Sequence, residues 1–348
     1  MQEDRQPLAA LYLIQLISAF LVLAGHYTAD VDDFIIWTTW EEKLNQFSRY
    51  GTVILAILTG YFTAYSLERK QVTMHTFFRG KLVHIFLPFI VSGIVYTLVL
   101  KRTIPYTAQY WTRILSGDAA GHLYFVFMLA QYYVFAYVFQ RWIKRSNILV
   151  VCAVFAAFQY GFINNTPAGW LALGVRHFLP AWIFTFYTGD ILYRYRSMIF
   201  TFFRKHSFVW FGLAVAATSS TIYVLMSPKL YTANHLSFVL GTWVWLVVVL
   251  YVLARCEEWL RIIPFRKGLT FQIYLWHPLF IIVGNKLFQR VGRLEWVLAH
   301  KWASAIYLGS LFIATYSMSA LYIEGLKWIH RRTAEKKEEK EQTVAWGS

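Results

Sequence analysis

Residues 8–28 read LAALYLIQLISAFLVLAGHYT and contain no Asp, Glu, Lys or Arg. An α-helix of about 20 mostly apolar residues is long enough to cross the hydrocarbon core of a lipid bilayer. The run is too long for the apolar part of a cleavable signal peptide, and no clear small-x-small cleavage motif follows it. We therefore expect residues 8–28 to form a permanent transmembrane helix.

Nine further apolar runs follow the first one, separated by short polar segments. They lie at residues 51–68, 82–100, 122–140, 148–163, 176–193, 208–226, 236–253, 269–287 and 303–326. The pattern predicts an all-α integral membrane protein, a single bundle of about ten transmembrane helices.

The composition agrees with a membrane bundle. Of the 348 residues, 58% are apolar and only 15% are charged, and the mean hydropathy is +0.44. A soluble domain carries about 25% charged residues. Aromatic residues reach 19%, and Trp and Tyr are enriched where a membrane protein meets the two bilayer interfaces.

The net charge of +15 is explained by topology rather than by nucleic-acid binding. Lys and Arg lie in the short segments between the runs, with an excess on the side that also carries both termini. Because cytoplasmic loops are enriched in Lys and Arg, we expect both termini in the cytoplasm. No repeat or low-complexity linker interrupts the chain, so we predict one domain over residues 1–330 and a charged cytoplasmic tail over 331–348.

Several kinds of site have no signature in the sequence. There is no GxSxG elbow, Walker loop, HExxH motif or CxxC pair. The two cysteines, Cys152 and Cys256, provide neither a disulfide framework nor a metal-ligand spacing. We therefore expect no metal and no redox cofactor.

His26 is the first candidate for chemistry, near the outer end of the first predicted helix. Asp30 follows it by four residues, so the two side chains share a face if the helix continues that far. A carboxylate beside one ring nitrogen orients an imidazole and raises the basicity of the other nitrogen, as in a general base. The alternative interpretation is a histidine that caps a helix end at the membrane interface.

Three other buried or interfacial positions are noteworthy because polar groups at membrane depth are costly. His277 precedes Pro278, which frees a backbone carbonyl one turn back, so His277 is either functional or a packing device bonded to that carbonyl. His122 begins the fourth predicted helix, where an interfacial histidine needs little explanation. Asp190 and Arg194 have the spacing of an ordinary helical ion pair.

The segment FFRGKLVHIFLP at residues 77–88 carries Arg79, Lys81 and His84 into the third predicted helix. Two or three of these side chains can converge at its cytoplasmic mouth. Such a cluster suits a phosphate-rich ligand such as a nucleotide cofactor. The positive-inside bias alone also predicts basic residues at this place.

Taken together, these segments resemble the membrane acyltransferase-3 family, ten-helix proteins that acylate cell-surface carbohydrates. The resemblance follows the order of the chain. It is carried by Gly25-His26, by GTVILAILTGYFTAYSL at 51–67 with its Thr59-Gly60-Tyr61-Phe62 signature, by the basic segment ending at Pro88, by HLYFVFML at 122–129 and by FQIYLWHPLF at 271–280.

The resemblance assigns roles to the candidate residues. It implies that His26, oriented by an acidic neighbour such as Asp30, is the catalytic residue. It implies that the acyl-CoA donor contacts Arg79, Lys81 and His84.

The same resemblance places His122 and His277 at family positions whose role is substrate binding or structure. Two departures concern the donor site. Gln15 stands where the family usually has an Arg, and Lys81-x-x-His84 replaces paired arginines.

The implied function is a membrane O-acyltransferase of the bacterial plasma membrane. It would move an acetyl or succinyl group from acyl-CoA to a hydroxyl of an extracytoplasmic cell-surface polysaccharide. The style of the first and ninth helices is most similar to the subgroup that modifies poly-N-acetylglucosamine. A polysaccharide synthase complex is the protein partner that such a role implies.

Two other classes of function stay open at this point. A polysaccharide exporter without catalysis would line a sugar path with aromatic rings, and a scaffold for a synthase complex would need none of the candidate site residues. The rings named for the exporter are Trp111, Tyr124, Trp170, Trp182 and Trp243.

Overall fold

The protein is described by a computed structural model that covers residues 7–32, 34–35, 39–69, 73–167, 173–226, 236–262 and 266–346. Every regular element in these ranges is helical and none is a strand. The all-α fold class is therefore confirmed. Trp170, one of the rings named for a sugar path, lies outside the described residues.

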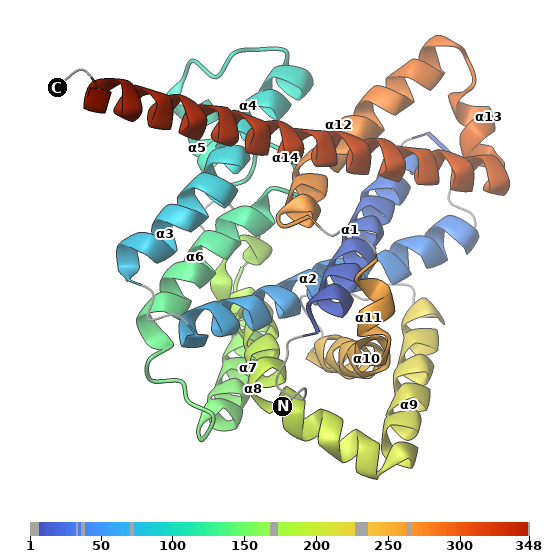
Figure 1. Ribbon diagram of the computed structural model, residues 1–348. Helices are drawn as coiled ribbons and strands as arrows, with labels where there is room; N and C mark the ends of the chain where they lie inside the picture. Colours follow the sequence, from blue (N-terminus) through green and yellow to red (C-terminus); the bar gives the residue numbers. More distant parts are fainter. Residues whose placement is uncertain are drawn as a thin grey trace. The chain divides into compact units, whose positions relative to one another are not determined.

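The chain divides into two compact units, residues 1–263 and 264–348. The first unit contains α1 (Leu8–Val31), α2 (Thr39–Arg69), α3 (Met74–Lys81), the π-helix η1 (Leu82–Phe86), α4 (Leu87–Lys101), α5 (Ala108–Leu115), α6 (Tyr124–Phe139), α7 (Ile148–Asn165), the 3-10 turns η3 (Val175–His177) and η4 (Leu179–Ala181), α8 (Ile183–Lys205), α9 (Ser207–Met226), α10 (Leu236–Arg255) and α11 (Glu257–Leu260). The second unit contains α12 (Leu269–Arg290), α13 (Leu294–Ala299) and α14 (Lys301–Trp346) (Figure 1).

Within the described residues, six helical stretches are long and apolar enough to cross a membrane. They are Leu8–Val31, Trp40–Glu68, Met74–Lys101, Ile148–Asn165, Leu236–Arg255 and Lys301–Trp328, and two shorter apolar helices lie at Tyr124–Phe139 and Ser207–Tyr223. A helix covers at least part of each of the ten predicted segments. The count of about ten spans, the side of the termini, and the division into a domain and a tail stay predictions.

Two predicted boundaries were wrong. The second predicted helix was given as 51–68, but α2 already begins at Thr39, where acidic residues in its first turn favour a helix N-terminus. The predicted helix 176–193 begins only at Ile183, because the preceding residues form the turns η3 and η4 around Pro180. A proline has no backbone N–H and disfavours the α conformation of the residue before it.

Helix α2 is the central element of the first unit and packs against both α1 and α8. Its crossing with α8 is close because two glycines meet there. A Cβ added at Gly60 would overlap the backbone oxygen of Phe186, and one added at Gly189 would overlap that of Ile57. Small residues let helix backbones approach in this way. The Thr59-Gly60-Tyr61-Phe62 signature thus has a packing function at this crossing.

Helices α1 and α2 run antiparallel. Asn45 near the start of α2 donates a hydrogen bond of 2.9 Å from its Nδ2 to Thr28 Oγ1 near the end of α1. Tyr12 near the start of α1 stacks on Phe62 toward the end of α2, with ring centroids 6.0 Å apart. The Glu257 carboxylate of α11 accepts hydrogen bonds from the first backbone N–H groups of α1, which places α11 at the N-terminal end of α1.

Helix α6 connects the two ends of the first unit. At its middle, Tyr132 stacks face to face on Phe186 of α8, with centroids 4.0 Å apart. From Tyr124 to Tyr137 the helix rises by about 20 Å, at 1.5 Å per residue. Features at the two ends of α6 are therefore about that far apart.

The second unit is built on the packing of α12 against α14. The Tyr307 hydroxyl donates a buried hydrogen bond of 2.9 Å to Asn285 Oδ1 across this contact. Glu324 pairs with both Arg266, at 3.2 Å, and Lys327, at 3.1 Å. Helix α14 continues without a break through the charged segment, as far as Trp346.

Candidate functional site

His26 lies in the last two turns of α1. Because α1 continues to Val31, His26 and Asp30 lie one helical turn apart on one face, as their spacing predicts. Both side chains are half-buried. The His26 ring meets the His122 ring in an edge-on arrangement, with centroids 5.9 Å apart and an interplanar angle of 75°.

His122 reaches this place from another part of the chain. It was expected to begin a helix at an interface, but it lies in the turn before α6 and is only 2% exposed. Its ring packs edge-on against fully buried Tyr96 of α4, with centroids 5.0 Å apart. The fold thus brings together two histidines that are 96 positions apart in the sequence.

The segment between α7 and α8 adds a cation to this pair. The Arg176 guanidinium lies over the Tyr124 ring at 4.6 Å from its centroid, and its charge acts electrostatically on His26. The next residue, His177, also contacts Tyr124, with ring centroids 5.5 Å apart. We call His26, His122, Tyr96, Tyr124 and Arg176 the histidine cluster.

The predicted donor residues lie near the other end of α6. The Lys81 ammonium is above the Tyr133 ring at 4.1 Å and near the Phe77 ring at 5.4 Å, whereas Arg79 and His84 are exposed. His84 belongs to the π-helix η1, a rare conformation that is often found at functional sites.

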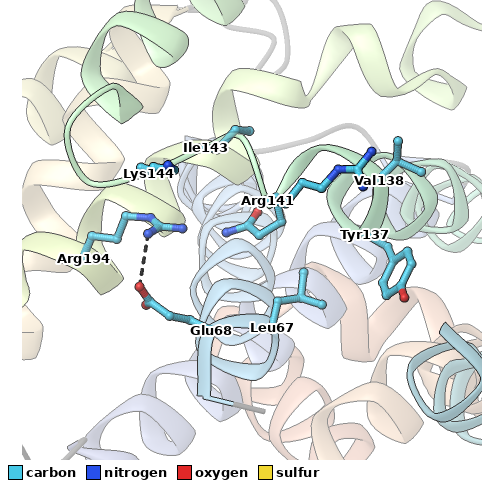
Figure 2. A pocket seen from close by; sticks show the side chains of 9 residues that line it. Leu67, Glu68, Tyr137, Val138, Arg141, Ile143, Lys144 and Arg194 are labelled. Atoms are coloured by element: carbon cyan, nitrogen blue, oxygen red, sulfur yellow. Dashed lines mark hydrogen bonds and ion pairs between the residues drawn. The ribbon is translucent and has the colours of Figure 1, made fainter. Parts of the chain in front are cut away.

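A pocket of about 550 Å³ with several charged residues in its lining lies at this end of the unit (Figure 2). It is lined by Leu67, Glu68, Tyr137, Val138, Gln140, Arg141, Ile143, Lys144 and Arg194. These residues come from the C-terminal end of α2, from α6 and the loop after it, and from α8. We call it the basic pocket, because three of its four charged residues are cationic.

The Arg194 side chain is held at the wall of the basic pocket. Its Nε donates to Asp190 Oδ1 at 2.7 Å, and its Nη1 donates to Glu68 Oε1 at 3.3 Å (Figure 2). Gln140 Nε2 donates to the second oxygen of the same buried Asp190 carboxylate at 3.1 Å. The predicted Asp190–Arg194 ion pair is confirmed. Arg141 and Lys144 are exposed and make the pocket accessible to an anion from solution.

Tyr137 connects the basic pocket to α3. Its ring lines the pocket, and it packs against Phe77 and Phe78, with both centroid distances 5.4 Å. The exposed Arg79 follows Phe78 directly. The basic pocket and the basic segment therefore belong to the same end of the first unit.

His277 belongs to the second unit and is fully buried. Its Nδ1 lies 2.8 Å from the carbonyl oxygen of Tyr274, the carbonyl to which Pro278 cannot donate a backbone hydrogen bond. This is the arrangement that the packing interpretation expects. A catalytic or binding role of His277 stays a prediction.

No group of three or more His, Cys, Asp and Glu residues that could hold a metal ion is present in the described part of the chain. Cys152 is buried, Cys256 is exposed, and both are free thiols. In the described part of the first unit, candidate site residues gather in the histidine cluster at one end of α6 and around the basic pocket at the other.

The model of the acyltransferase-3 family, described as an acyltransferase domain, matches residues 8–324. The chain belongs to this family. No curated protein and no solved structure matches the chain. As an acyltransferase-3 domain with several membrane-length helices, the protein is a multi-pass membrane acyltransferase.

Sequence reasoning on this acyltransferase missed Tyr96 and the partnership of His26 with His122. Which helices pack together is a tertiary property that hydropathy does not encode. Arg176 was also missed, although a signal was present: it is a cation within the predicted span 176–193, and an ionisable residue in a span is by default a functional candidate.

Proposed function

We propose that the protein moves an acetyl or succinyl group from an acyl-CoA donor to a hydroxyl group of an extracytoplasmic polysaccharide. The observation that supports this proposal best is the pairing of His26 with His122 inside an acyltransferase-3 domain. Acyl transfer to a hydroxyl needs a group that removes a proton, and histidine is the usual general base near neutral pH.

His26 acts as the base in this proposal. Its imidazole takes the proton from the sugar hydroxyl while the hydroxyl oxygen attacks the thioester carbonyl carbon. The tetrahedral intermediate then expels the CoA thiolate, which receives the proton from His26, so that the products are an ester and CoA. The alternative, in which His26 carries the acyl group, uses the same residue as nucleophile.

The other members of the histidine cluster position the base. Asp30, one turn along α1, orients the ring through its second nitrogen, and the His122 ring limits its rotation from the other side. His122 is itself fixed by Tyr96 of α4. Burial of these rings keeps bulk water from the acyl group, which would otherwise be lost to hydrolysis.

The donor is held at the opposite end of α6. Arg79, Lys81 and His84 bind its phosphates together with Arg141 and Lys144 of the basic pocket. Guanidinium and ammonium groups suit phosphate oxygens, and exposed ones are reached from solution. The pantetheine arm of CoA is a long flexible chain, which suits a path of about 20 Å along α6.

The expected setting is the bacterial plasma membrane, crossed by about ten helices with both termini in the cytoplasm. The donor end then faces the cytoplasm, where acyl-CoA is made. The acceptor we favour is poly-N-acetylglucosamine, from the resemblance of the first and ninth helices to that subgroup. A polysaccharide synthase complex would deliver it.

The exporter alternative is not favoured by the contacts of its aromatic residues. The Trp182 indole is buried and donates to the Arg176 carbonyl at 3.0 Å. The Trp243 indole donates to the Thr188 carbonyl at 2.8 Å. Both rings are fixed by hydrogen bonds to the backbone, which is typical of packing.

The direct test is CoA release by the purified protein in lipid nanodiscs. Acetyl-CoA and succinyl-CoA serve as donors, and oligomers of N-acetylglucosamine with free amines and with acetylated amines serve as acceptors. The variants are His26→Ala and the double substitution Arg79→Ala/Lys81→Ala. His206→Ala is the matched control, since His206 is exposed at the junction of α8 and α9.

We expect turnover with one donor, its loss in His26→Ala, and weaker donor binding in the basic double variant. The control retains the wild-type rate. Folded wild-type protein that neither binds nor turns over any donor would contradict the proposed function.

A further inference from the structure

The segment that carries Arg176 is fastened to α6 by a single glutamine. Gln131 Nε2 donates to the His177 carbonyl at 2.8 Å, and Gln131 Oε1 accepts from the Leu179 backbone N–H at 3.1 Å. The Trp182 indole adds the bond to the Arg176 carbonyl. Residues 173–182, which contain η3 and η4, are thus held in place before α8, and the backbone of Arg176 has a fixed position.

The Arg176 side chain points from this segment to the histidine cluster. Its guanidinium lies over the Tyr124 ring, and Tyr124 follows His122 by two residues. His122 in turn contacts His26. The stacking of Arg176 on Tyr124 and the contact of His122 with His26 therefore place the guanidinium in the neighbourhood of the His26 ring.

The guanidinium is available to a ligand. The Arg176 side chain is exposed, and no carboxylate of the described residues forms an ion pair with it. A guanidinium stacked on an aromatic ring directs its N–H groups sideways, away from that ring. By contrast Arg113, also close in sequence to the cluster, is paired with Asp118 at 3.0 Å.

We propose that Arg176 donates hydrogen bonds to the acyl carbonyl oxygen and stabilises the oxyanion that develops during transfer at His26. As the nucleophile bonds to the carbonyl carbon, the π electrons of the C=O bond move to the oxygen, and the guanidinium compensates that charge. When the oxyanion collapses, the C=O bond re-forms and the C–S bond breaks. The inference rests on the proposed function, and it applies whether the nucleophile is the sugar hydroxyl or His26.

A cation at this place explains why the segment is rigid. Preorganised donors directed at a developing charge are among the largest contributions to enzymatic rate, and they act only if they need not reorganise. An arginine on a mobile loop would lose much of this effect. The two hydrogen bonds of Gln131 and the indole of Trp182 supply the required fixation.

The test compares Arg176→Ala, Arg176→Gln and Arg176→Lys with wild type. The matched control is Arg255→Ala, because Arg255 is an exposed arginine that stacks on Tyr251 at 5.1 Å, at the end of α10. For each protein we would measure kcat, donor affinity and thermal stability, and repeat the kinetics with added methylguanidinium. The small cation can occupy the space left by the side chain in Arg176→Ala.

We expect kcat to fall by about 10²–10³-fold in Arg176→Ala and Arg176→Gln, the range for removal of one oxyanion-binding donor. Arg176→Lys keeps the positive charge but loses the planar set of N–H donors, so its kcat should lie between that of these variants and that of wild type. The affinity for the donor should stay within about twofold of wild type, and the melting temperature within about 2 °C. Methylguanidinium should raise kcat of Arg176→Ala only.

Two results would overturn the inference. If wild type turns over but kcat of folded Arg176→Gln stays within threefold of it, or if methylguanidinium raises no rate, Arg176 does not bind the oxyanion while the proposed function stands. If wild type itself does not turn over any donor, both proposals fail together.

Discussion

The two ends of α6 carry opposite kinds of polar site. At the N-terminal end, His122 and Tyr96 are buried to 2% exposure or less, and the His122 ring contacts the rings of both His26 and Tyr96. At the C-terminal end, the basic pocket is open, and only Arg194 is fixed by ion pairs. A site packed against buried rings suits bond-making, whereas an open and charged one suits the arrival of a soluble anion. The difference indicates a division between chemistry and binding.

The largest effect should come from removing the base at the buried end. We expect His26→Ala to lower kcat by about 10²–10⁴-fold, the usual contribution of a general base. Donor affinity should not change, because we propose that the donor binds at the other end. Stopped-flow CoA release and a binding isotherm measure the two quantities. A variant that loses donor affinity instead would show that the ends are not separate sites.

The close crossing of α2 and α8 should affect both ends at once. In Gly60→Ala the new methyl group must displace the Phe186 backbone, and overpacking of this kind costs about 1–3 kcal/mol. We expect a lower melting temperature together with lower kcat and lower donor affinity. The control is Gly212→Ala on α9, where nothing lies within 4 Å of an added Cβ. Equal stability of Gly60→Ala and Gly212→Ala would contradict the close approach of the α2 and α8 backbones at Gly60.

Binding of the donor at the basic pocket can be weakened without changing the histidine cluster. In the double variant Arg141→Ala/Lys144→Ala we expect the KM for acyl-CoA to rise about tenfold with kcat unchanged, which corresponds to about 1.4 kcal/mol of lost binding. The rise should shrink as salt increases, since exposed charges are screened. Arg255→Ala again serves as the control, because it removes an exposed cation outside the pocket. A fall in kcat with unchanged KM would place these residues in the chemistry.

His277, which lies in the second unit, should have the smallest effect. If it satisfies the Tyr274 carbonyl that Pro278 leaves open, His277→Ala should lose about 1 kcal/mol of stability and little activity. Adding Pro278→Ala restores a backbone N–H and should recover part of the loss. A double variant with activity far below wild type would instead support a functional role.

Sequence reasoning located the helices well and their partners poorly. Long apolar runs are local properties, so a helix lies over each predicted segment, from Leu8–Val31 to Lys301–Trp346. Breaks that depend on one residue, such as Pro180 before α8, were missed. The site divides in the same way. His26 and Asp30 were predicted from their spacing within one helix, but the His26–His122 contact and the place of Arg176 depend on how distant segments pack.

The measurement that tests the division most directly is the sidedness of acyl transfer in sealed proteoliposomes. Cys256 is the exposed thiol of the chain's described residues and adjoins α11 at the N-terminal end of α1, the end that carries the basic pocket. Its reaction with a membrane-impermeant maleimide therefore reports which side the donor end faces. Radiolabelled acyl-CoA is supplied on that side only, and the acceptor oligomer is enclosed on the other. For vesicles in which the donor end faces outward, we predict labelled oligomer inside the vesicles, absent in His26→Ala; enclosed oligomer that stays unlabelled while the same vesicles release CoA from acyl-CoA would contradict the account.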